Sequence, residues 1–348
     1  MKIWSRRARI TEKYSDKDMT KILVCGYGSI GKKHALNLQK LQADIKIWRQ
    51  RGDQVQAVID DGFVFEPSLD AGLEWCDAAV IATATNSHIE PAMKAAQLQK
   101  PFYLEKPVSH NKDGLDMLVE AAQGLVVEVG CQMRQHPNLK ALQTRLQKGE
   151  DGAVLAFQAW VGQRLDQWRP GTDYRKSYSA DAERGGGALF DLVHEIDLMT
   201  WLAGVMQSVY ADLRQNSDLE MKAEDLANLV LVTRAGAAGT VQLDMLSPAY
   251  RRGLQIICAR AIYRWEMTEG ILWRDDGSGA VCIDKITDDY KPSMMLFDTM
   301  AHFLKRVNDP SIPASCSLAE GVHDLDILLG AREAHKTGQR QMLEEVKI

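Results

Sequence analysis

Residues 21–40, KILVCGYGSIGKKHALNLQK, carry the clearest structural signal in the chain. A short apolar run leads into Gly26, Gly28 and Gly31, which have the spacing G-x-G-x-x-G, and apolar side chains then recur at helical spacing. Between a strand and a helix, the first glycine allows a tight turn, the second lets the backbone approach a pyrophosphate, and the third lets the helix pack closely on the strand. This pattern predicts a dinucleotide site, and the alternative is a glycine-rich turn that binds no ligand.

The residues after the second strand distinguish between the two nicotinamide cofactors. An NAD site usually has an acidic residue there, which binds the ribose hydroxyls, whereas this chain has Arg49 and Arg51. Because a guanidinium pairs well with a 2′-phosphate, the two arginines favour NADP over NAD. Two alternatives stay open, since Asp53 could bind the ribose of NAD and both arginines could simply be solvated. The predicted turn of the cofactor site comprises Gly26, Tyr27, Gly28, Ser29, Ile30 and Gly31.

Short apolar segments alternate with helical segments as far as residue 130. Because strands of this kind are buried on both faces, they predict a parallel sheet that is covered by helices on each side. Six such strands are typical of a doubly wound, dinucleotide-binding domain. The predicted strands are KILVCG (21–26), DIKIW (44–48), GFVF (62–65), DAAVIATA (77–84), PFYLEK (101–106) and LVVEVG (125–130).

The pattern changes after residue 130. The runs from SVYADLRQN (208–216) to AVCIDKI (280–286) follow one another with turns and no helices between them, which predicts a large open antiparallel sheet. Helices are expected at about 294–307 and 317–336, the last one packing back on the first domain. The predicted fold class is α/β, a Rossmann doubly wound parallel sheet followed by an α+β domain. We assign residues 1–20 to an N-terminal extension, 21–130 to the Rossmann domain, and 131–348 to a substrate-binding and oligomerisation domain.

The composition excludes several classes of protein. The 348 residues include 42 Lys+Arg against 47 Asp+Glu, so the net charge of −5 gives no basic excess for binding nucleic acid. No run approaches the roughly 18 apolar residues of a membrane span, and residues 1–20 lack the apolar core of a secretory signal. The six cysteines form no C-x-x-C pair, which favours buried thiols in a cytoplasmic protein and suggests no metal site.

One strand-like run bears on the oligomeric state. LQIICARAIYRWEM (254–267) has apolar residues in both of its alternating sets, so the sheet that contains it needs cover on two faces. A second subunit can supply that cover. We therefore expect a homodimer or a homotetramer formed through the C-terminal sheet.

Two segments supply candidate catalytic residues. Lys106, within Glu105-Lys106-Pro107, follows the fifth strand at the edge where open α/β sheets bind ligands, so its charge could stabilise an alkoxide beside a nicotinamide. An ordinary surface lysine is the alternative. His194 follows Asp191 by three residues, which in one continuous helix would let the carboxylate orient the imidazole for acid–base chemistry. A structural cap or a metal pair is the alternative there, although no further ligands at metal spacing lie nearby.

Five motifs occur in an order that resembles the Gfo/Idh/MocA oxidoreductases: GYGSIGKKHALNL, ATATNSHIEPAMKAA, FYLEKPVS, VGCQMRQHPNL and GGGALFDLVHEIDLMTWL. The resemblance covers about residues 21–340. It implies a Rossmann domain paired with an α+β domain whose open sheet often forms the oligomer interface. It also implies NAD(P)-dependent oxidation or reduction of a hydroxyl of a sugar, an inositol or a sugar nucleotide.

The resemblance further implies roles for single residues. Lys106 matches the lysine that lies beside the nicotinamide and the substrate hydroxyl, and His194 matches the proton donor or acceptor. Asp191 resembles the aspartate before that histidine, although the family spacing is often four residues and here it is three. A cis peptide before Pro107 is implied as well. Cofactor contacts are expected from Thr83, Asn86, His88, Glu105 and Lys106.

The stretch 168–179 and the glycines at 185–187 narrow the resemblance to the subgroup encoded beside acylneuraminate and other surface-polysaccharide genes. Cations here could bind a carboxylate or a phosphate and aromatic rings could stack on a sugar face, which favours a nucleotide-linked or acidic sugar. The alternative is an arm that packs between subunits. The predicted substrate contacts are Arg134, Arg164, Trp168, Tyr174, Arg175 and Tyr178.

These observations predict an NAD(P)-dependent dehydrogenase or reductase that acts on the CH–OH groups of a carbohydrate. Two rival hypotheses are a non-catalytic, nucleotide-sensing regulator and a reductase of a carbon–carbon double bond, similar to biliverdin reductase. The presence of both Lys106 and His194 favours the dehydrogenase.

Overall fold

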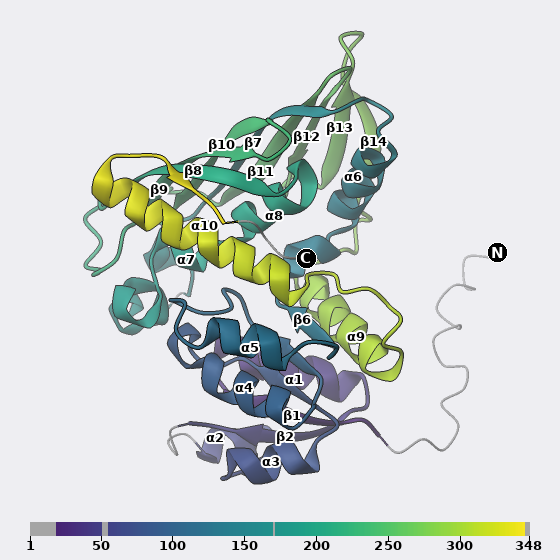
Figure 1. Ribbon diagram of the computed structural model, residues 1–348, viewed down its shortest axis with the longest axis vertical. Helices are drawn as coiled ribbons and strands as arrows, with labels where there is room; N and C mark the ends of the chain where they lie inside the picture. The colour runs from purple at the N-terminus through teal and green to yellow at the C-terminus, as the bar shows by residue number, and fades with distance from the viewer. Residues whose placement is uncertain (1–18, 51–54, 170, 345–348) are drawn as a thin grey trace, which may run out of the picture.

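The computed structural model describes residues 19–50, 55–169 and 171–344. These residues form two domains, which lie one above the other in Figure 1, the first in purple and blue and the sheet of the second in teal and green. Arg51, Asp53 and nearly all of the predicted N-terminal extension lie outside the described residues. Within the described part of the chain, no helix is both long enough and apolar enough to cross a membrane.

The first domain is the predicted doubly wound sheet. Its six strands are all parallel and have the order β3-β2-β1-β4-β5-β6, so the strand order reverses between β1 and β4. Ligands of such sheets bind at this reversal, outside the carboxyl ends of the strands. The strands are β1 (Lys21–Cys25), β2 (Asp44–Trp48), β3 (Val64–Glu66), β4 (Ala78–Ile81), β5 (Phe102–Leu104) and β6 (Val127–Val129). The helices are α1 (Ser29–Lys40), α2 (Val55–Asp60), α3 (Leu69–Trp75), α4 (Ile89–Gln97) and α5 (Leu115–Ala121).

Burial explains why this part of the chain was predictable. Ile22 to Cys25 of β1 are fully buried, as expected for a central strand with helices on both faces. In α1 the buried residues are Gly31, His34, Ala35 and Leu38, which share one face of the helix. The apolar runs and the helical spacing in the sequence therefore reflect a sheet that is covered by helices on both faces.

The second domain is built on a nine-stranded sheet with the order β14-β13-β12-β11-β7-β10-β9-β8-β15. The expected antiparallel arrangement is confirmed except between β7 and β10, which run parallel. The run 254–267 forms two strands instead of one, β11 and β12, which pair as a hairpin. The strands are β7 (Val154–Gly162), β8 (Met206–Arg214), β9 (Leu226–Thr233), β10 (Ala238–Asp244), β11 (Arg251–Cys258), β12 (Ile262–Glu266), β13 (Ile271–Asp275), β14 (Val281–Lys285) and β15 (Gln341–Met342).

Helices cover one face of this second sheet and join it to the first domain (Figure 1). They are α6 (Pro137–Lys148), α7 (Ala188–Asp191), α8 (His194–Ala203), α9 (Ser293–Asn308) and α10 (Leu318–Thr337). The last helix, α10, begins beside the first domain, where Gly321 lies against Val108 and Val129, and then runs along β8. The helix before it, α9, packs on α1, and its Phe303 ring lies 5.9 Å from that of Tyr103.

Candidate active site

A cavity of about 630 Å³ opens where the strand order of the first sheet reverses. Both domains contribute to its walls, so it lies in the crevice between them. From the first domain it is lined by Gly26, Tyr27, Gly28, Ser29, Ile30, Lys33, Arg49, Gln50, Ala82, Thr83, Ala84, Thr85, Asn86, Ser87, His88, Glu105 and Lys106. From the second it is lined by Gln132, Arg169, Tyr178, Ser179, Arg184, Asp191 and His194.

The three glycines of the turn have different surroundings. A Cβ atom on Gly26 would lie 2.5 Å from the Ala82 carbonyl oxygen, and one on Gly31 would collide with the carbonyl oxygen of Gly26. A Cβ on Gly28 would meet no protein atom within 4 Å. Packing therefore requires Gly26 and Gly31 to be glycines, whereas the bare backbone at Gly28 lies against open space. This arrangement fits a pyrophosphate, which needs close approach of the backbone at the second glycine.

The start of α1 is suited to an anion. No side chain caps this helix at Gly28, and its first turn contains no acidic residue. The free N–H groups and the positive end of the helix dipole would therefore face a bound phosphate. Arg49 lines the same cavity, and so does Lys33, which the sequence analysis missed although it lies one turn after Ser29. Arg51 lies outside the described residues.

Glu105 is buried at the end of β5 and is held by protein groups. Its Oε1 lies 2.6 Å from Nε2 of His34 and accepts a hydrogen bond from the Tyr103 hydroxyl at 3.1 Å. Burial by itself raises the pKa of this carboxyl, but the His34 hydrogen bond and the nearby charges of His34 and Lys106 outweigh it, and the pKa lies below its ordinary value. Glu105 is thus an anion fixed beneath the cavity floor, next to Lys106.

Lys106 reaches from the first domain to the second. Its Nζ donates to the main-chain carbonyl of Asp191 at 2.7 Å and lies 3.8 Å from Oδ1 of the same residue. That carbonyl is available because α7 ends at Asp191 and α8 begins only at His194. The peptide bond before Pro107 is cis, as the resemblance implied. The ammonium group is therefore held in the cavity by one hydrogen bond and keeps two further donors.

His194 lines the cavity from the second domain, at the start of α8, and it is 5% exposed. Burial lowers the pKa of its imidazole well below 6.5, and the positive charges of Lys106 and Arg252 lower it further. The ring is therefore neutral at neutral pH and can accept a proton. Its Nδ1 is buried and has no hydrogen-bond partner among the described residues.

The predicted pairing of Asp191 with His194 is wrong. It assumed one continuous helix from residue 187, whereas the structure has two helices with a break between Asp191 and His194. Because of this break, the Asp191 carboxylate accepts a hydrogen bond from Ser179 Oγ at 2.6 Å instead of orienting the imidazole. Asp191 therefore positions Lys106, through its carbonyl oxygen, and not His194.

The turn after β4 brings three of the predicted cofactor residues to the cavity, namely Thr83, Asn86 and His88. His88 is buried and braces the turn, because its Nδ1 lies 3.0 Å from the Pro107 carbonyl oxygen and its Nε2 lies 3.2 Å from that of Thr83. Burial lowers the pKa of His88 below its ordinary value. Its role in the structure is to tie the Thr83 turn to the segment that carries Lys106.

Tyr178 spans the cavity between the domains. Its hydroxyl lies 2.6 Å from the Gly185 carbonyl oxygen, to which it donates, and 2.7 Å from Oγ1 of Thr85 in the first domain. The Thr85 hydroxyl is therefore the donor in the second contact. This pair of hydrogen bonds fixes part of the segment between β7 and α7, residues 178 to 185, at the cavity.

Four other predicted substrate contacts in this segment do not line the cavity. Arg164 forms ion pairs with Asp166 and Asp218, and Arg175 forms one with Asp173 at 2.8 Å. The other two, Trp168 and Tyr174, use their polar atoms on the backbone of Gln163 and Glu220. Their interaction with a substrate stays a prediction that this cavity does not support.

The prediction that Arg134 contacts the substrate is wrong, because this side chain is 1% exposed and lies within the protein core. Its guanidinium donates to Asp197 at 2.6 Å, to Glu320 at 2.6 Å and to the Ser315 carbonyl at 2.8 Å. It therefore joins α8 to the start of α10. Gln132, two residues earlier in the same turn, lines the cavity instead.

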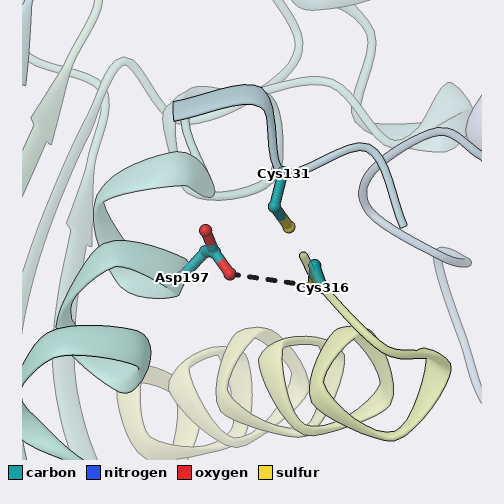
Figure 2. Close-up of side chains that lie close together, drawn as sticks. All are labelled: Cys131, Asp197 and Cys316. Carbon is teal, nitrogen blue, oxygen red and sulfur yellow. Dashed lines mark hydrogen bonds between the residues drawn. The ribbon is translucent and has the colours of Figure 1, made fainter. Parts of the chain in front are cut away.

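Asp197 of α8, the partner of Arg134, also belongs to a buried group in which it faces the thiols of Cys131 and Cys316 (Figure 2). The possible ligand atoms of these side chains lie within 4.8 Å of one another. The Asp197 carboxylate is already neutralised by Arg134, whose Nε and terminal nitrogen both donate to it. A guanidinium at this position would repel a metal cation, so the group is explained by its ion pair.

Comparison with family models matches both domains. The NAD-binding Rossmann fold of an oxidoreductase family matches residues 20–132, and the GFO/IDH/MocA C-terminal domain matches residues 139–264. The chain belongs to the Gfo/Idh/MocA family of oxidoreductases. The resemblance inferred from the five motifs is thereby confirmed at the level of the family.

Several Gfo/Idh/MocA relatives are similar along much of the chain. Myo-inositol 2-dehydrogenase of Thermotoga maritima is 26% identical over 241 residues, which is 64% of this chain and 67% of the relative. A levoglucosan dehydrogenase in complex with NADH has a TM-score of 0.83 at 18% identity, covering 94% of this chain and all of that one. The WlbA dehydrogenase from Bordetella pertussis, in complex with NADH and UDP-GlcNAcA, has a TM-score of 0.76 at 21% identity, covering 94% and 98%. At these identities the two solved structures establish a shared fold.

Proposed function

We propose that this protein is an NAD(P)-dependent dehydrogenase that interconverts a hydroxyl and a keto group on a sugar or an inositol. One observation carries the proposal: Lys106 from the first domain and His194 from the second line the same cavity as the open backbone at Gly28. The relatives named as myo-inositol and levoglucosan dehydrogenases support a polyhydroxylated substrate. Retention of both side chains argues against a non-catalytic regulator.

The residues that line the cavity have separate roles in the proposed reaction. A bound nicotinamide would supply or accept the hydride, held by the glycine turn and by the turn that carries Thr83, Asn86 and His88. In the oxidative direction, the neutral imidazole of His194 accepts the hydroxyl proton of the substrate. The ammonium group of Lys106 stabilises the developing alkoxide with the donors that Asp191 leaves free. In the reductive direction the same two groups return the proton to the new hydroxyl.

The finer details are proposals as well. NADP is favoured over NAD because Arg49, directly after β2, lines the cavity at the point in the chain where an NAD site usually has an acidic residue, and Lys33 lines the same cavity. We propose an acidic or nucleotide-linked sugar as the substrate, as in the acylneuraminate subgroup. A homo-oligomer is proposed through the uncovered face of the second sheet, where Tyr210 and Val230 are cross-strand partners and are 40% and 41% exposed.

Replacement of Lys106 tests the catalytic proposal. The variant Lys106→Met keeps the length of the side chain and removes its charge, so we expect turnover of any accepted sugar to fall at least about a hundredfold. Binding of NADH or NADPH, measured by fluorescence titration, should change little, because the glycine turn is intact. Equal losses of turnover and of cofactor affinity would contradict the role given to Lys106.

A further inference from the structure

The cavity carries an excess of positive charge, although the whole chain has a net charge of −5. Its described lining side chains include two carboxylates, Glu105 and Asp191, and both already accept hydrogen bonds from protein groups. A concave surface with uncompensated charge of one sign concentrates ligands of the opposite sign. The cationic side chains that line the cavity are Lys33, Arg49, Lys106, Arg169 and Arg184.

These cations come from different walls of the cavity. Lys33 and Arg49 belong to the first domain, beside the glycine turn, so the phosphates of a dinucleotide account for them. Arg169 and Arg184 belong to the second domain, in the segment between β7 and α7. The phosphates of the cofactor therefore do not account for Arg169 and Arg184.

Arg169 and Arg184 differ from the other arginines of their segment. Within the described residues, neither guanidinium has a hydrogen bond or an ion pair, and both side chains are exposed at the cavity. Arg164 and Arg175, by contrast, are paired with aspartates and do not line the cavity. Within the described residues, the segment thus neutralises Arg164 and Arg175 and leaves the guanidinium groups of Arg169 and Arg184 without a partner at the cavity.

Tyr178 relates Arg184 to the reacting centre. Burial raises the pKa of the Tyr178 phenol, the Asp191 carboxylate adds to this rise, and the Arg184 guanidinium opposes it. The Tyr178 hydroxyl donates to the carbonyl oxygen of Gly185, the residue after Arg184, at 2.6 Å. The neighbouring Ser179 donates to the Asp191 carboxylate at 2.6 Å, and the Asp191 carbonyl oxygen holds Lys106. A ligand whose hydroxyl lies at Lys106 can extend past Tyr178 towards Arg184.

We infer that Arg169 and Arg184 bind an oxyanion of the substrate, while its reacting hydroxyl lies between Lys106 and His194. The oxyanion is the carboxylate of a sugar acid or a phosphate of a sugar nucleotide, since a guanidinium binds both in the same bidentate geometry. This inference rests on the proposed function for the reaction, and it adds the two side chains that select an anionic substrate. It replaces Arg164 and Arg175, which the sequence analysis assigned to that role.

Binding and turnover of charged and neutral ligands test the inference. The variants are Arg169→Gln, Arg184→Gln and their combination, with Arg175→Gln as the comparator from the same segment. The probes are myo-inositol, glucuronate, UDP-glucose and UDP-glucuronate, titrated calorimetrically into the NADH-saturated protein and assayed for cofactor reduction with NAD and NADP. A carboxylate subsite favours glucuronate over myo-inositol, whereas a phosphate subsite favours UDP-glucose.

We expect an anionic probe to bind the unaltered protein more tightly than myo-inositol does. Each of the variants at Arg169 and Arg184 should weaken that binding about tenfold, because each removes a charge-assisted hydrogen bond. Affinity for NADH and for myo-inositol should stay the same, and Arg175→Gln should behave like the unaltered protein.

Three results would overturn the inference. The first is that no anionic probe binds better than myo-inositol, and the second is that Arg175→Gln has the same effect as the other variants. The third is that the variants at Arg169 and Arg184 weaken NADH binding as much as probe binding, which would assign them to the cofactor. If the protein oxidises myo-inositol but prefers no anionic probe, the oxyanion subsite is refuted and the proposed reaction stands. Tight anion binding without hydride transfer to any probe would count against the proposed reaction and leave the subsite standing.

Discussion

Substitution of Gly28 separates cofactor binding from folding. The backbone at Gly28 has φ −79° and ψ −166°, which an alanine can adopt, and its Cβ would meet no protein atom within 4 Å. Gly28→Ala should therefore leave the stability of the cofactor-free protein within about 1 kcal/mol of the unaltered value, because the conformational freedom that the unfolded chain loses is offset by a poorer N-cap for α1. The added methyl group would nevertheless occupy the space into which a pyrophosphate must come, so cofactor affinity should fall sharply.

Gly31→Ala is the matched control for this experiment. Its Cβ would collide with the Gly26 carbonyl oxygen, so β1 or α1 must shift. We expect this variant to lose about 1–3 kcal/mol of stability even without cofactor, as for other overpacked sites. The pair of substitutions thus predicts a small change in stability for one glycine of the motif and a clear loss for the other in the cofactor-free protein.

The assay is thermal unfolding with and without NADH or NADPH, after the dissociation constant of the unaltered protein has been measured. At a ligand concentration of 100 times that constant, binding should stabilise the unaltered protein by about 2.7 kcal/mol. Gly28→Ala should show little of this gain at the same concentration. A full gain in Gly28→Ala, or a cofactor-free form as unstable as that of Gly31→Ala, would refute the assignment of Gly28 to the pyrophosphate.

Three further predictions concern the remaining groups. The pKa of His194 lies well below 6.5 in the folded protein, whereas in the unfolded chain it has its ordinary value. Below pH 6.5 the unfolded chain therefore binds a proton that the folded protein does not, so the free energy of unfolding should fall as the pH falls through that value. The acid limb of a pH profile of kcat/KM should likewise lie below pH 6.5, and His194→Asn should remove it. Arg134→Met leaves the buried Asp197 unpaired and should cost about 3–5 kcal/mol in denaturant unfolding, with an unchanged dissociation constant for NADH in the folded protein. Tyr178→Phe removes the hydrogen bonds to Gly185 and Thr85, so KM should rise several-fold, and an unchanged KM would show that this bridge does not shape the site.

The fold was predictable because its signals are local. The glycine turn at Gly26, the continuous apolar strands and the helical spacing of α1 all arise from contacts within a single strand–turn–helix unit. The parallel pairing of β7 with β10 was missed because it depends on which distant strand is inserted beside β7. Nothing in the local pattern of either strand distinguishes a parallel neighbour from an antiparallel one.

Parts of the site were missed for a related reason. Arg134 looked like a substrate contact, but its partners Asp197 and Glu320 come from α8 and α10. Arg164 is neutralised by Asp218, which is also distant in the sequence. A charged residue that is paired in the fold cannot be told from an unpaired one by its neighbours in the chain, so Arg169 was passed over. The polar and charged side chains that line the cavity but were not predicted from the sequence are Lys33, Gln50, Thr85, Ser87, Gln132, Arg169, Ser179 and Arg184.

The break between α7 and α8 is the other feature that the sequence concealed. The segment ALFDLVHEID reads as one helix by its apolar spacing, yet the helix is interrupted between Asp191 and His194. This interruption frees the Asp191 carbonyl oxygen for Lys106 and leaves His194 at the start of the next helix. A short deviation from helical geometry therefore decides which side chain the aspartate positions.

Transfer of deuterium from the cofactor tests the proposed reaction most directly. The protein would be incubated with NADH or NADPH that carries deuterium at C4 of the nicotinamide, together with a panel of neutral and anionic keto sugars, and the products would be analysed by mass spectrometry. We predict a gain of one deuterium on the carbon of the new hydroxyl group, and no gain with Lys106→Met. A protein that binds the cofactor but transfers no deuterium to any member of the panel would show that the crevice between the two domains does not reduce sugars.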